Sequence, residues 1–212
     1  MIKISHILII IIASSAGFIF LWLERLYSNI PLFGNLTAIT NDGIIFTFAL
    51  LISVVTSPGI ALTIVIIAAL LAIHDHHIRL WWFSTGLLIT GIAASTLMKN
   101  IIMLPRPEYG LIKLSTYGFP STHATLATII CIVGIWLTYN WRNISHRKTI
   151  LYTLIIGWII ICLSRMLLGV HSTSDVLAGV LLGSIISSMG ILVAPLFLHR
   201  SSIIMANRHE IN

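Results

Sequence analysis

The sequence predicts an all-α membrane protein, a polytopic bundle of six transmembrane helices with one short helix at the membrane interface. Of its 212 residues, 58% are hydrophobic and 8% are charged, and the mean hydropathy is +1.03. A soluble domain carries roughly 25% charged residues, so these charges are too few to cover a surface that faces water. The apolar residues also form runs that suit bilayer spans of about 20 residues. We therefore expect a single membrane-embedded domain over residues 1–212.

The first apolar run ends at Glu24 and Arg25. It contains no convincing small-residue cleavage site, which favours a retained span over a cleaved signal peptide. The run Gly43–Val55 is too short to span, so we expect it to lie at the interface or against the bundle. Pro58 suits the first turn of the helix that follows. The predicted spans cover about residues 7–23, 59–73, 80–98, 121–139, 150–168 and 175–198, and the interfacial helix covers about 43–55.

Polar breaks separate these runs, and the longest lies between Lys99 and Pro120. The turn His74-Asp75-His76-His77 favours a loop over a metal site, because adjacent residues do not share a face. Cys131 and Cys162 lie in apolar runs without a CxxC pair. We expect them to be small buried side chains without a redox role.

Six spans place both termini on one side of the membrane, and seven of the 12 Lys and Arg residues fall on that side. Three of the other five belong to the polar cluster described below, which leaves Arg25 and Lys113 as ordinary outward charges. The positive-inside rule then predicts cytoplasmic termini and an outward Lys99–Pro120 segment. This topology also accounts for the net charge of +6. The basic residues are spread over short loops, so we expect no nucleic-acid partner.

Polar residues gather at the predicted outward ends of spans three to six. Charges at membrane depth are costly and mark functional sites. Because odd spans end outside and even spans begin there, segments distant in the sequence converge on one patch. The segments are Lys99 with Arg106-Pro107, Pro120-Ser121-Thr122-His123, and Ser164-Arg165 with His171 and Asp175.

The predicted patch holds three cations against one carboxylate, which suits a multiply charged anion such as phosphate. Arg binds phosphate in a bidentate manner and Lys binds it as a point charge. The helix that starts near Ser121 adds unpaired backbone N–H groups and the positive end of its dipole.

His171 and Asp175 are four residues apart, so one helical turn would bring them together. A carboxylate that accepts one imidazole N–H fixes the tautomer and leaves the other nitrogen available to attack phosphorus. His123, which enters from another helix, would protonate the leaving oxygen as general acid. A lone histidine at a helix end is more often a capping or interfacial residue, so the prediction depends on the whole set.

These motifs resemble those of the type 2 phosphatidic acid phosphatase family, the lipid-phosphate phosphatases related to vanadium haloperoxidases. The family motifs are K-x6-R-P, P-S-G-H and S-R-x5-H-x3-D. Here they stand as Lys99…Arg106-Pro107, Pro120-Ser121-Thr122-His123 and Ser164-Arg165…His171…Asp175, with matching spacing in the first and third. The motifs span residues 99–175, and the six-helix plan extends the resemblance over nearly the whole chain.

The resemblance implies a role for each motif residue. His171 would form a phosphohistidine, Asp175 would orient it, and His123 would serve the leaving group. The phosphoryl oxygens would be held by Lys99, Arg106, Ser121, Arg165 and the backbone at Thr122, with Ser164, Pro107 and Pro120 in support. The resemblance implies no metal and no other cofactor.

Thr122 departs from the family pattern, which has glycine at this position. Threonine keeps the backbone N–H that would bind phosphate. Its β-branched side chain restricts the backbone and narrows the space beside the phosphate. We therefore expect an effect on substrate size or rate and not a loss of chemistry.

The sequence thus predicts hydrolysis of a lipid phosphate or pyrophosphate at the outer face of a bacterial inner membrane. Undecaprenyl pyrophosphate is the first candidate by family analogy, followed by phosphatidic acid, phosphatidylglycerol phosphate and lipid A phosphates. A phosphotransferase would use the same residues. An alternative of another class is a non-catalytic lipid-phosphate binding or transport protein, although a transporter is expected to carry broken segments at mid-membrane. The expected partners are the lipid substrate and membrane lipids, with no obligate protein partner.

Overall fold

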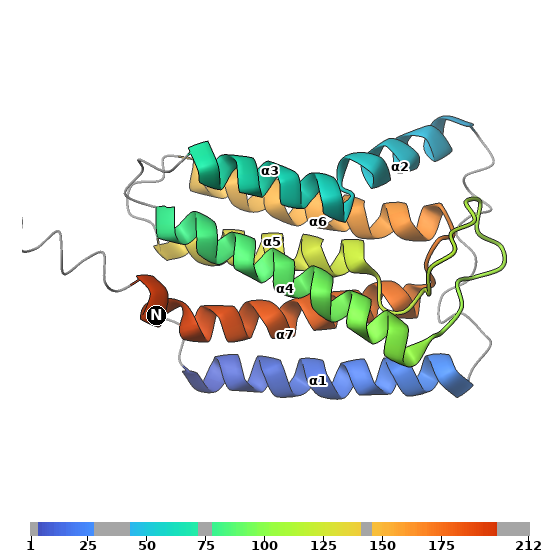
Figure 1. The fold of residues 1–212 in the computed structure, drawn as a ribbon, viewed down its shortest axis with the longest axis horizontal. Helices are drawn as coiled ribbons and strands as arrows, with labels where there is room; N and C mark the ends of the chain where they lie inside the picture. The colour runs from blue at the N-terminus through green and yellow to red at the C-terminus, as the bar shows by residue number, and fades with distance from the viewer. Residues whose placement is uncertain (1–3, 28–42, 72–77, 141–145, 199–212) are drawn as a thin grey trace, which may run out of the picture.

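A computed structural model describes residues 4–27, 43–71, 78–140 and 146–198, and within those ranges the protein is all-helical (Figure 1). The predicted turn at His74–His77 lies outside the described residues. The helices are α1 (Ile4–Tyr27), α2 (Gly43–Val55), α3 (Pro58–Leu71), α4 (Ile78–Ile102), α5 (Thr122–Asn140), α6 (Arg147–Leu167) and α7 (Thr173–Leu198). The predicted all-α class is confirmed.

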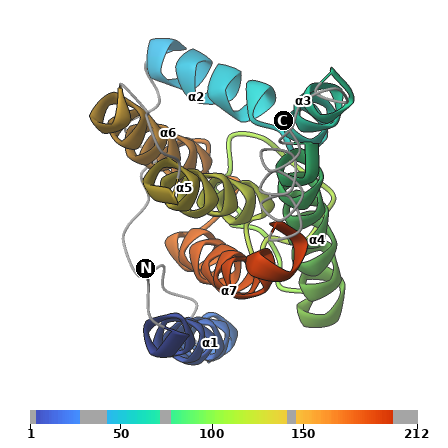
Figure 2. The ribbon, with the colours of Figure 1, turned by 90° about the vertical axis from the view of Figure 1, so that its left-hand side faces the viewer.

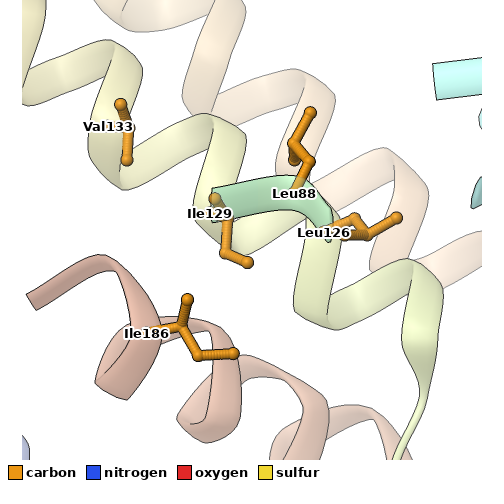
Figure 3. Packing of buried hydrophobic residues seen from close by; sticks show 5 residues of the cluster. All are labelled: Leu88, Leu126, Ile129, Val133 and Ile186. Atoms are coloured by element: carbon orange, nitrogen blue, oxygen red, sulfur yellow. The ribbon is translucent and has the colours of Figure 1, made fainter. Parts of the chain in front are cut away.

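The bundle is built around α5, which packs against α4, α6 and α7. Helix α1 packs against the opposite face of α7, α3 packs on α4, and α2 packs on α6 (Figure 2). The largest buried apolar cluster joins α4, α5 and α7 (Figure 3). It consists of Leu88, Leu126, Ile129, Val133 and Ile186.

The outer surface of the bundle is apolar, as a lipid environment requires. On α1, for example, Ile12 is 68% exposed and Phe20 is 65% exposed. Helices α1, α4, α5, α6 and α7 are each long and apolar enough to cross a membrane. These features indicate an integral membrane protein.

The segment predicted as an interfacial helix and a separate span forms the bent pair α2 and α3. The two helices meet at an angle of 45° and together satisfy the criteria for a span, which makes the count five or up to six. Alone, the 14 residues of α3 would reach about 21 Å, less than the apolar core of roughly 30 Å. The bend falls at Ser57-Pro58 because proline has no N–H to donate and disfavours helical geometry in the preceding residue.

With α2 and α3 taken as one bent pair, the helices run in alternating directions, so that their first and last residues gather at the two ends of the bundle (Figure 1). Helix α1 begins and α7 ends at one end, while the α4–α5 connection, the end of α6 and the start of α7 lie at the other. The described parts of α1 and α7 therefore agree with termini on one side. Their cytoplasmic location stays a prediction.

Candidate active site

The connection between α4 and α5 is held against the end of the bundle by backbone hydrogen bonds. Leu111 N–H donates to the Leu168 carbonyl at 3.1 Å, and Gly118 N–H donates to the Leu104 carbonyl at 2.9 Å. Ser121 N–H donates to the Asp175 carbonyl at 2.9 Å. The Ser121 bond joins the second motif segment to the third, and the Gly118 bond joins the end of the connection to the first motif segment.

Asp175 is fixed by the first turn of α7. Its Oδ2 accepts a hydrogen bond from the Ser172 N–H at 2.9 Å, and its own N–H donates to Ser172 Oγ at 3.2 Å. This reciprocal arrangement is a capping box, which satisfies helix-end donors and sets the carboxylate in one place. Asp175 is completely buried.

His171 lies between this carboxylate and Arg106. Its Nδ1 is 3.6 Å from Asp175 Oδ2, and its Nε2 is 3.2 Å from Arg106 Nη1. The first distance is an ion-pair contact longer than a hydrogen bond, and such contacts commonly tighten when a substrate binds. An Arg donor at Nε2 favours the tautomer whose proton is on Nδ1, toward Asp175. The side chain thus has the arrangement that the four-residue spacing predicts.

Burial lowers the pKa of the His171 imidazole, and Asp175 opposes part of that effect. Lys99 and Arg106 add a smaller lowering of this pKa. The net direction is below the ordinary histidine value, so His171 is neutral at pH 7. A neutral imidazole has the lone pair that nucleophilic attack requires.

The three predicted phosphate-binding cations are held by neutral oxygen acceptors. Lys99 Nζ donates to the carbonyls of Tyr117 and Gly118 at 2.9 and 3.1 Å. Arg106 donates to the Val170 carbonyl at 2.7 Å and to both the carbonyl and the hydroxyl of Thr116. Arg165 donates to Ser53 Oγ. These contacts orient the cations without neutralising them.

A cavity of about 430 Å³ opens beside these groups. Its wall includes most of the predicted site: Lys99, Arg106, Thr122, His123, Arg165 and His171. Ser121 is fully buried outside this wall, and its Oγ has no hydrogen-bond partner. Ser164 is also buried and donates to the Ile161 carbonyl within its own helix at 2.7 Å. Pro120 is buried and joined to Phe119 by a cis peptide bond, and Pro107 lies outside the wall.

His123 faces α2 as well as the cavity. Its Nε2 is 3.2 Å from the Ser53 carbonyl, so the same residue of α2 contacts both His123 and Arg165. Sequence reasoning missed Ser53 because a serine in an apolar helix gives no distinguishing signal. It also missed Arg25, whose Nε lies 3.7 Å from Asp175 Oδ1.

An apolar groove of about 470 Å³ continues from the cavity along α3 and α4. The groove and the cavity share Ile92, Thr96 and Asn100. The other lining residues of the groove are Leu62, Ile89, Ala93 and Leu97. A polar cavity and an apolar groove are therefore joined in one depression.

The site offers few ligands of the kind that metals need. In the ranges that the structure describes, no three His, Cys, Asp or Glu side chains are grouped to hold a metal ion. Cys131 and Cys162 are free and buried, as expected.

Fold and site together define a membrane helix bundle with a cation-lined cavity at one end. The model of the PAP2 superfamily matches residues 79–197, more than half of the chain, and the protein belongs to this family. The predicted resemblance is thereby confirmed.

Three similar proteins place this membership in context. Sphingosine-1-phosphate phosphatase 1 of Rattus norvegicus is 43% identical over 97 residues, covering 39% of this chain and 20% of that protein. Sphingosine-1-phosphate phosphatase 2 of Homo sapiens is 32% identical over 101 residues, covering 42% and 23%. The matches thus span about a fifth of the length of these relatives. The crystal structure of a transmembrane PAP2-type phosphatidylglycerolphosphate phosphatase from Bacillus subtilis has a TM-score of 0.66 and 19% identity, covering 87% of this chain and 95% of that one, which shows a shared fold.

Proposed function

We propose that this protein removes phosphate from a lipid through a phosphohistidine formed at His171. The observation that carries the proposal is the position of His171, buried between Asp175 and Arg106 on the wall of a cavity lined by cations. Membership of the PAP2 superfamily supports the same chemistry. The reaction needs an anion site, a nucleophile and a proton donor, and the cavity wall supplies a candidate for each.

In the first step, His171 Nε2 attacks phosphorus and forms an N–P bond while the bond from phosphorus to the leaving oxygen breaks. His123 donates a proton to that oxygen. Arg106 Nη1, which lies 3.2 Å from Nε2 in the structure, turns to a phosphoryl oxygen and releases the lone pair. Lys99 and Arg165 hold the other oxygens, where fixed positive charge stabilises the transferring group.

In the second step, water attacks the phosphohistidine. His123 accepts a proton from the water, and the N–P bond breaks to release inorganic phosphate and regenerate neutral His171. A lipid hydroxyl in place of water would give a phosphotransferase with the same residues. Asp175 orients the imidazole in both steps.

The apolar groove supports a lipid substrate over a soluble phosphate ester. A tail that lies along Ile89, Ala93 and Leu97 would place its phosphate in the cavity. The candidates are undecaprenyl pyrophosphate, phosphatidic acid, phosphatidylglycerol phosphate and lipid A phosphates, to which the names of the relatives add sphingosine-1-phosphate. We place the site at the outer face of a bacterial inner membrane, on the charge bias of the loops.

The decisive experiment measures phosphate release from these lipids by purified protein in detergent. The variant His171→Ala should lose at least about 1000-fold in kcat, because removal of a covalent nucleophile has effects of this order or larger. The control is His146→Ala, since His146 is exposed and its side chain makes no capping hydrogen bond. Equal rates for His171→Ala and the parent would refute the mechanism. Binding of the lipids without turnover by the parent would support the binding-protein alternative, and activity abolished by EDTA would contradict the metal-free assignment.

A second experiment tests the groove. The variant Ala93→Trp fills it and should raise KM for long-chain lipid phosphates by about tenfold, the effect of losing roughly 1.4 kcal/mol of binding. A short-chain phosphate ester should be hydrolysed as before. Ala13→Trp, on the exposed face of α1, is the matched control. A rise in KM that is the same for long and short chains would exclude the groove as the tail site.

A further inference from the structure

Arg25 lies in the last turn of α1, outside the segment matched by the PAP2 model, and reaches the start of α7. Its Nε is 3.7 Å from Asp175 Oδ1, and the two side chains are 17% and 0% exposed. Its Nη2 donates to the Pro105 carbonyl at 3.0 Å. Arg25 does not line the cavity. It is therefore in contact with the catalytic constellation without facing the position of the substrate.

The two oxygens of Asp175 have different surroundings. Oδ2 accepts the Ser172 N–H and faces His171 Nδ1. Oδ1 is buried and has no hydrogen-bond partner, and Arg25 Nε is buried without one as well. These two groups of opposite charge face each other. Charge-assisted N–H···O bonds measure about 2.7–2.9 Å, so a movement of about 1 Å would join them.

Among the described residues, only Arg25 and His171 lie within ion-pair distance of Asp175, and His171 carries a charge only when it is protonated. Lys99 and Arg106 are bonded to backbone carbonyls of the α4–α5 connection and to Val170. A buried carboxylate without a partner is strongly unfavourable. The charge that compensates Oδ1 therefore comes from α1.

The second bond of Arg25 connects it to the other side of the imidazole. Pro105, which accepts the Nη2 hydrogen bond, directly precedes Arg106, and Arg106 Nη1 lies 3.2 Å from His171 Nε2. The Arg25 guanidinium thus contacts Asp175, which faces Nδ1 of the imidazole, and the backbone next to Arg106, which faces Nε2.

We propose that Arg25 is a positioning residue that aligns His171 by holding Asp175 and the Pro105–Arg106 backbone. The inference rests on the proposed function and deepens it. Because Arg25 acts through groups that it contacts and not through the substrate, it affects the rate of the chemical step and leaves binding of the lipid nearly unchanged.

The kinetic test compares Arg25→Gln and Arg25→Lys with the control Lys113→Gln. Lys113 is the other cation that the sequence predicts as an ordinary outward charge. Lys113 is exposed and donates only to the Glu108 carbonyl among its described hydrogen bonds. Arg25→Gln should lower kcat by about 100-fold, the effect of misplacing a reacting group by about 1 Å, with KM within about twofold of the parent. Arg25→Lys should recover part of the rate, and Lys113→Gln should match the parent.

A double-mutant cycle separates positioning from a general structural role. If Arg25 acts largely through Asp175, then Arg25→Gln should cost much less in an Asp175→Asn background than in the parent. Equal losses in both backgrounds would overturn the inference, as would an Arg25→Gln variant with the kcat of the parent. Thermal unfolding of each variant shows whether it is folded. If Arg25→Gln does not fold, the same comparison of the two backgrounds is made with Arg25→Lys.

A measurement without turnover keeps this inference distinct from the proposed function. In protein labelled with ¹⁵N-histidine, the imidazole resonances of His171 are assigned by their loss in His171→Ala. Arg25→Gln should shift or broaden them, whereas Lys113→Gln should leave them in place. If no lipid in the panel is hydrolysed, the proposed function fails while this spectrum still decides the role of Arg25. Unchanged His171 resonances in Arg25→Gln would overturn that role.

Discussion

The three cationic side chains on the cavity wall donate hydrogen bonds to neutral oxygen atoms. Lys99 and Arg106 bond to carbonyl oxygens, and Arg165 bonds to a serine hydroxyl. Among the described residues, none of the three lies within ion-pair distance of a carboxylate. Their charges are thus oriented and uncompensated, which is the preorganisation that stabilises a transferring phosphoryl group at little cost in rearrangement.

The protonation state of His171 leads to the first prediction. Burial lowers its pKa below the ordinary value of 6.5, so the neutral form persists as pH falls from 7 and is lost only through the lower folded value. The facing groups are Asp175 from α7, which raises this pKa, and Lys99 and Arg106, which lower it. In ¹⁵N-histidine spectra, His171 should not titrate between pH 7.5 and about 6, whereas a model histidine peptide titrates near 6.5.

Direct titration is preferable to a rate profile here, because the second pKa of a phosphate ester lies near 6 and shapes any such profile. The lowered pKa of His171 also makes the stability of the folded protein depend on pH. A group whose pKa is lower in the folded state contributes stability at a pH above its unfolded pKa. That stability is lost as the pH falls through the folded pKa. A His171 midpoint at or above 6.5 would contradict the neutral nucleophile.

The sequence predicted the residues that belong to the three motifs, and it missed Arg25 and Ser53, which lie in helices outside those motifs. The four-residue spacing of His171 and Asp175 implies their contact wherever the chain turns once. Arg25 and Ser53 have no such signal. A cation after an apolar run is normally a topological charge, and a serine among apolar residues has no periodic partner. Only packing of α1 on α7 and of α2 on α6 brings them to the site.

At the scale of helices, the sequence predicted where most elements lie but not how α2 and α3 are related. The boundaries of α2 coincide with the predicted interfacial helix at 43–55, since Ser57-Pro58-Gly59 limits it. The hydrophobicity of a short helix does not distinguish a helix that lies on the bilayer surface from one that continues into the next helix as a bent span. In the structure α2 packs on α6 at the site end of the bundle (Figure 1). Ala49 of α2 is buried there beside Leu168 and Val170.

The close approach of α5 and α7 gives the prediction at this scale. A Cβ at Gly179 would lie 2.5 Å from the Ser121 carbonyl oxygen and 2.9 Å from Ala124 Cβ. Gly179→Ala should push the start of α5 away from α7, with a loss of stability of about 1–3 kcal/mol. Because Ser121 N–H bonds to the Asp175 carbonyl, activity should fall as well. The measurements are thermal unfolding in detergent and kcat.

The control for this prediction is Gly157→Ala in α6, where an added Cβ meets nothing within 4 Å. Alanine favours helix over glycine by about 1 kcal/mol, so this variant should be as stable as the parent or more stable. If Gly179→Ala behaved like Gly157→Ala, contact between α5 and α7 would not fix the site.

At the scale of the whole molecule, the alternation of apolar runs and polar breaks determines which helix ends meet. That is why three motifs spread over residues 99–175 were predicted on one patch, and the structure places their helix ends at one end of the bundle. The pattern does not depend on counting α2 and α3 as one bent span or as a surface helix and a short span. It leaves the direction of the bundle in the membrane to the charge bias alone.

Accessibility to a membrane-impermeant maleimide tests that direction. Lys113 and Arg79 are both exposed; Lys113 lies in the α4–α5 connection and Arg79 in the first turn of α4, at the opposite end of the bundle. In intact bacterial cells Lys113→Cys should be labelled, whereas Arg79→Cys should be labelled only after permeabilisation. The background is low because Cys131 and Cys162 are buried, and the parent protein measures it. The reverse pattern would place His171 at the cytoplasmic face, so that its lipid would have to come from the inner leaflet.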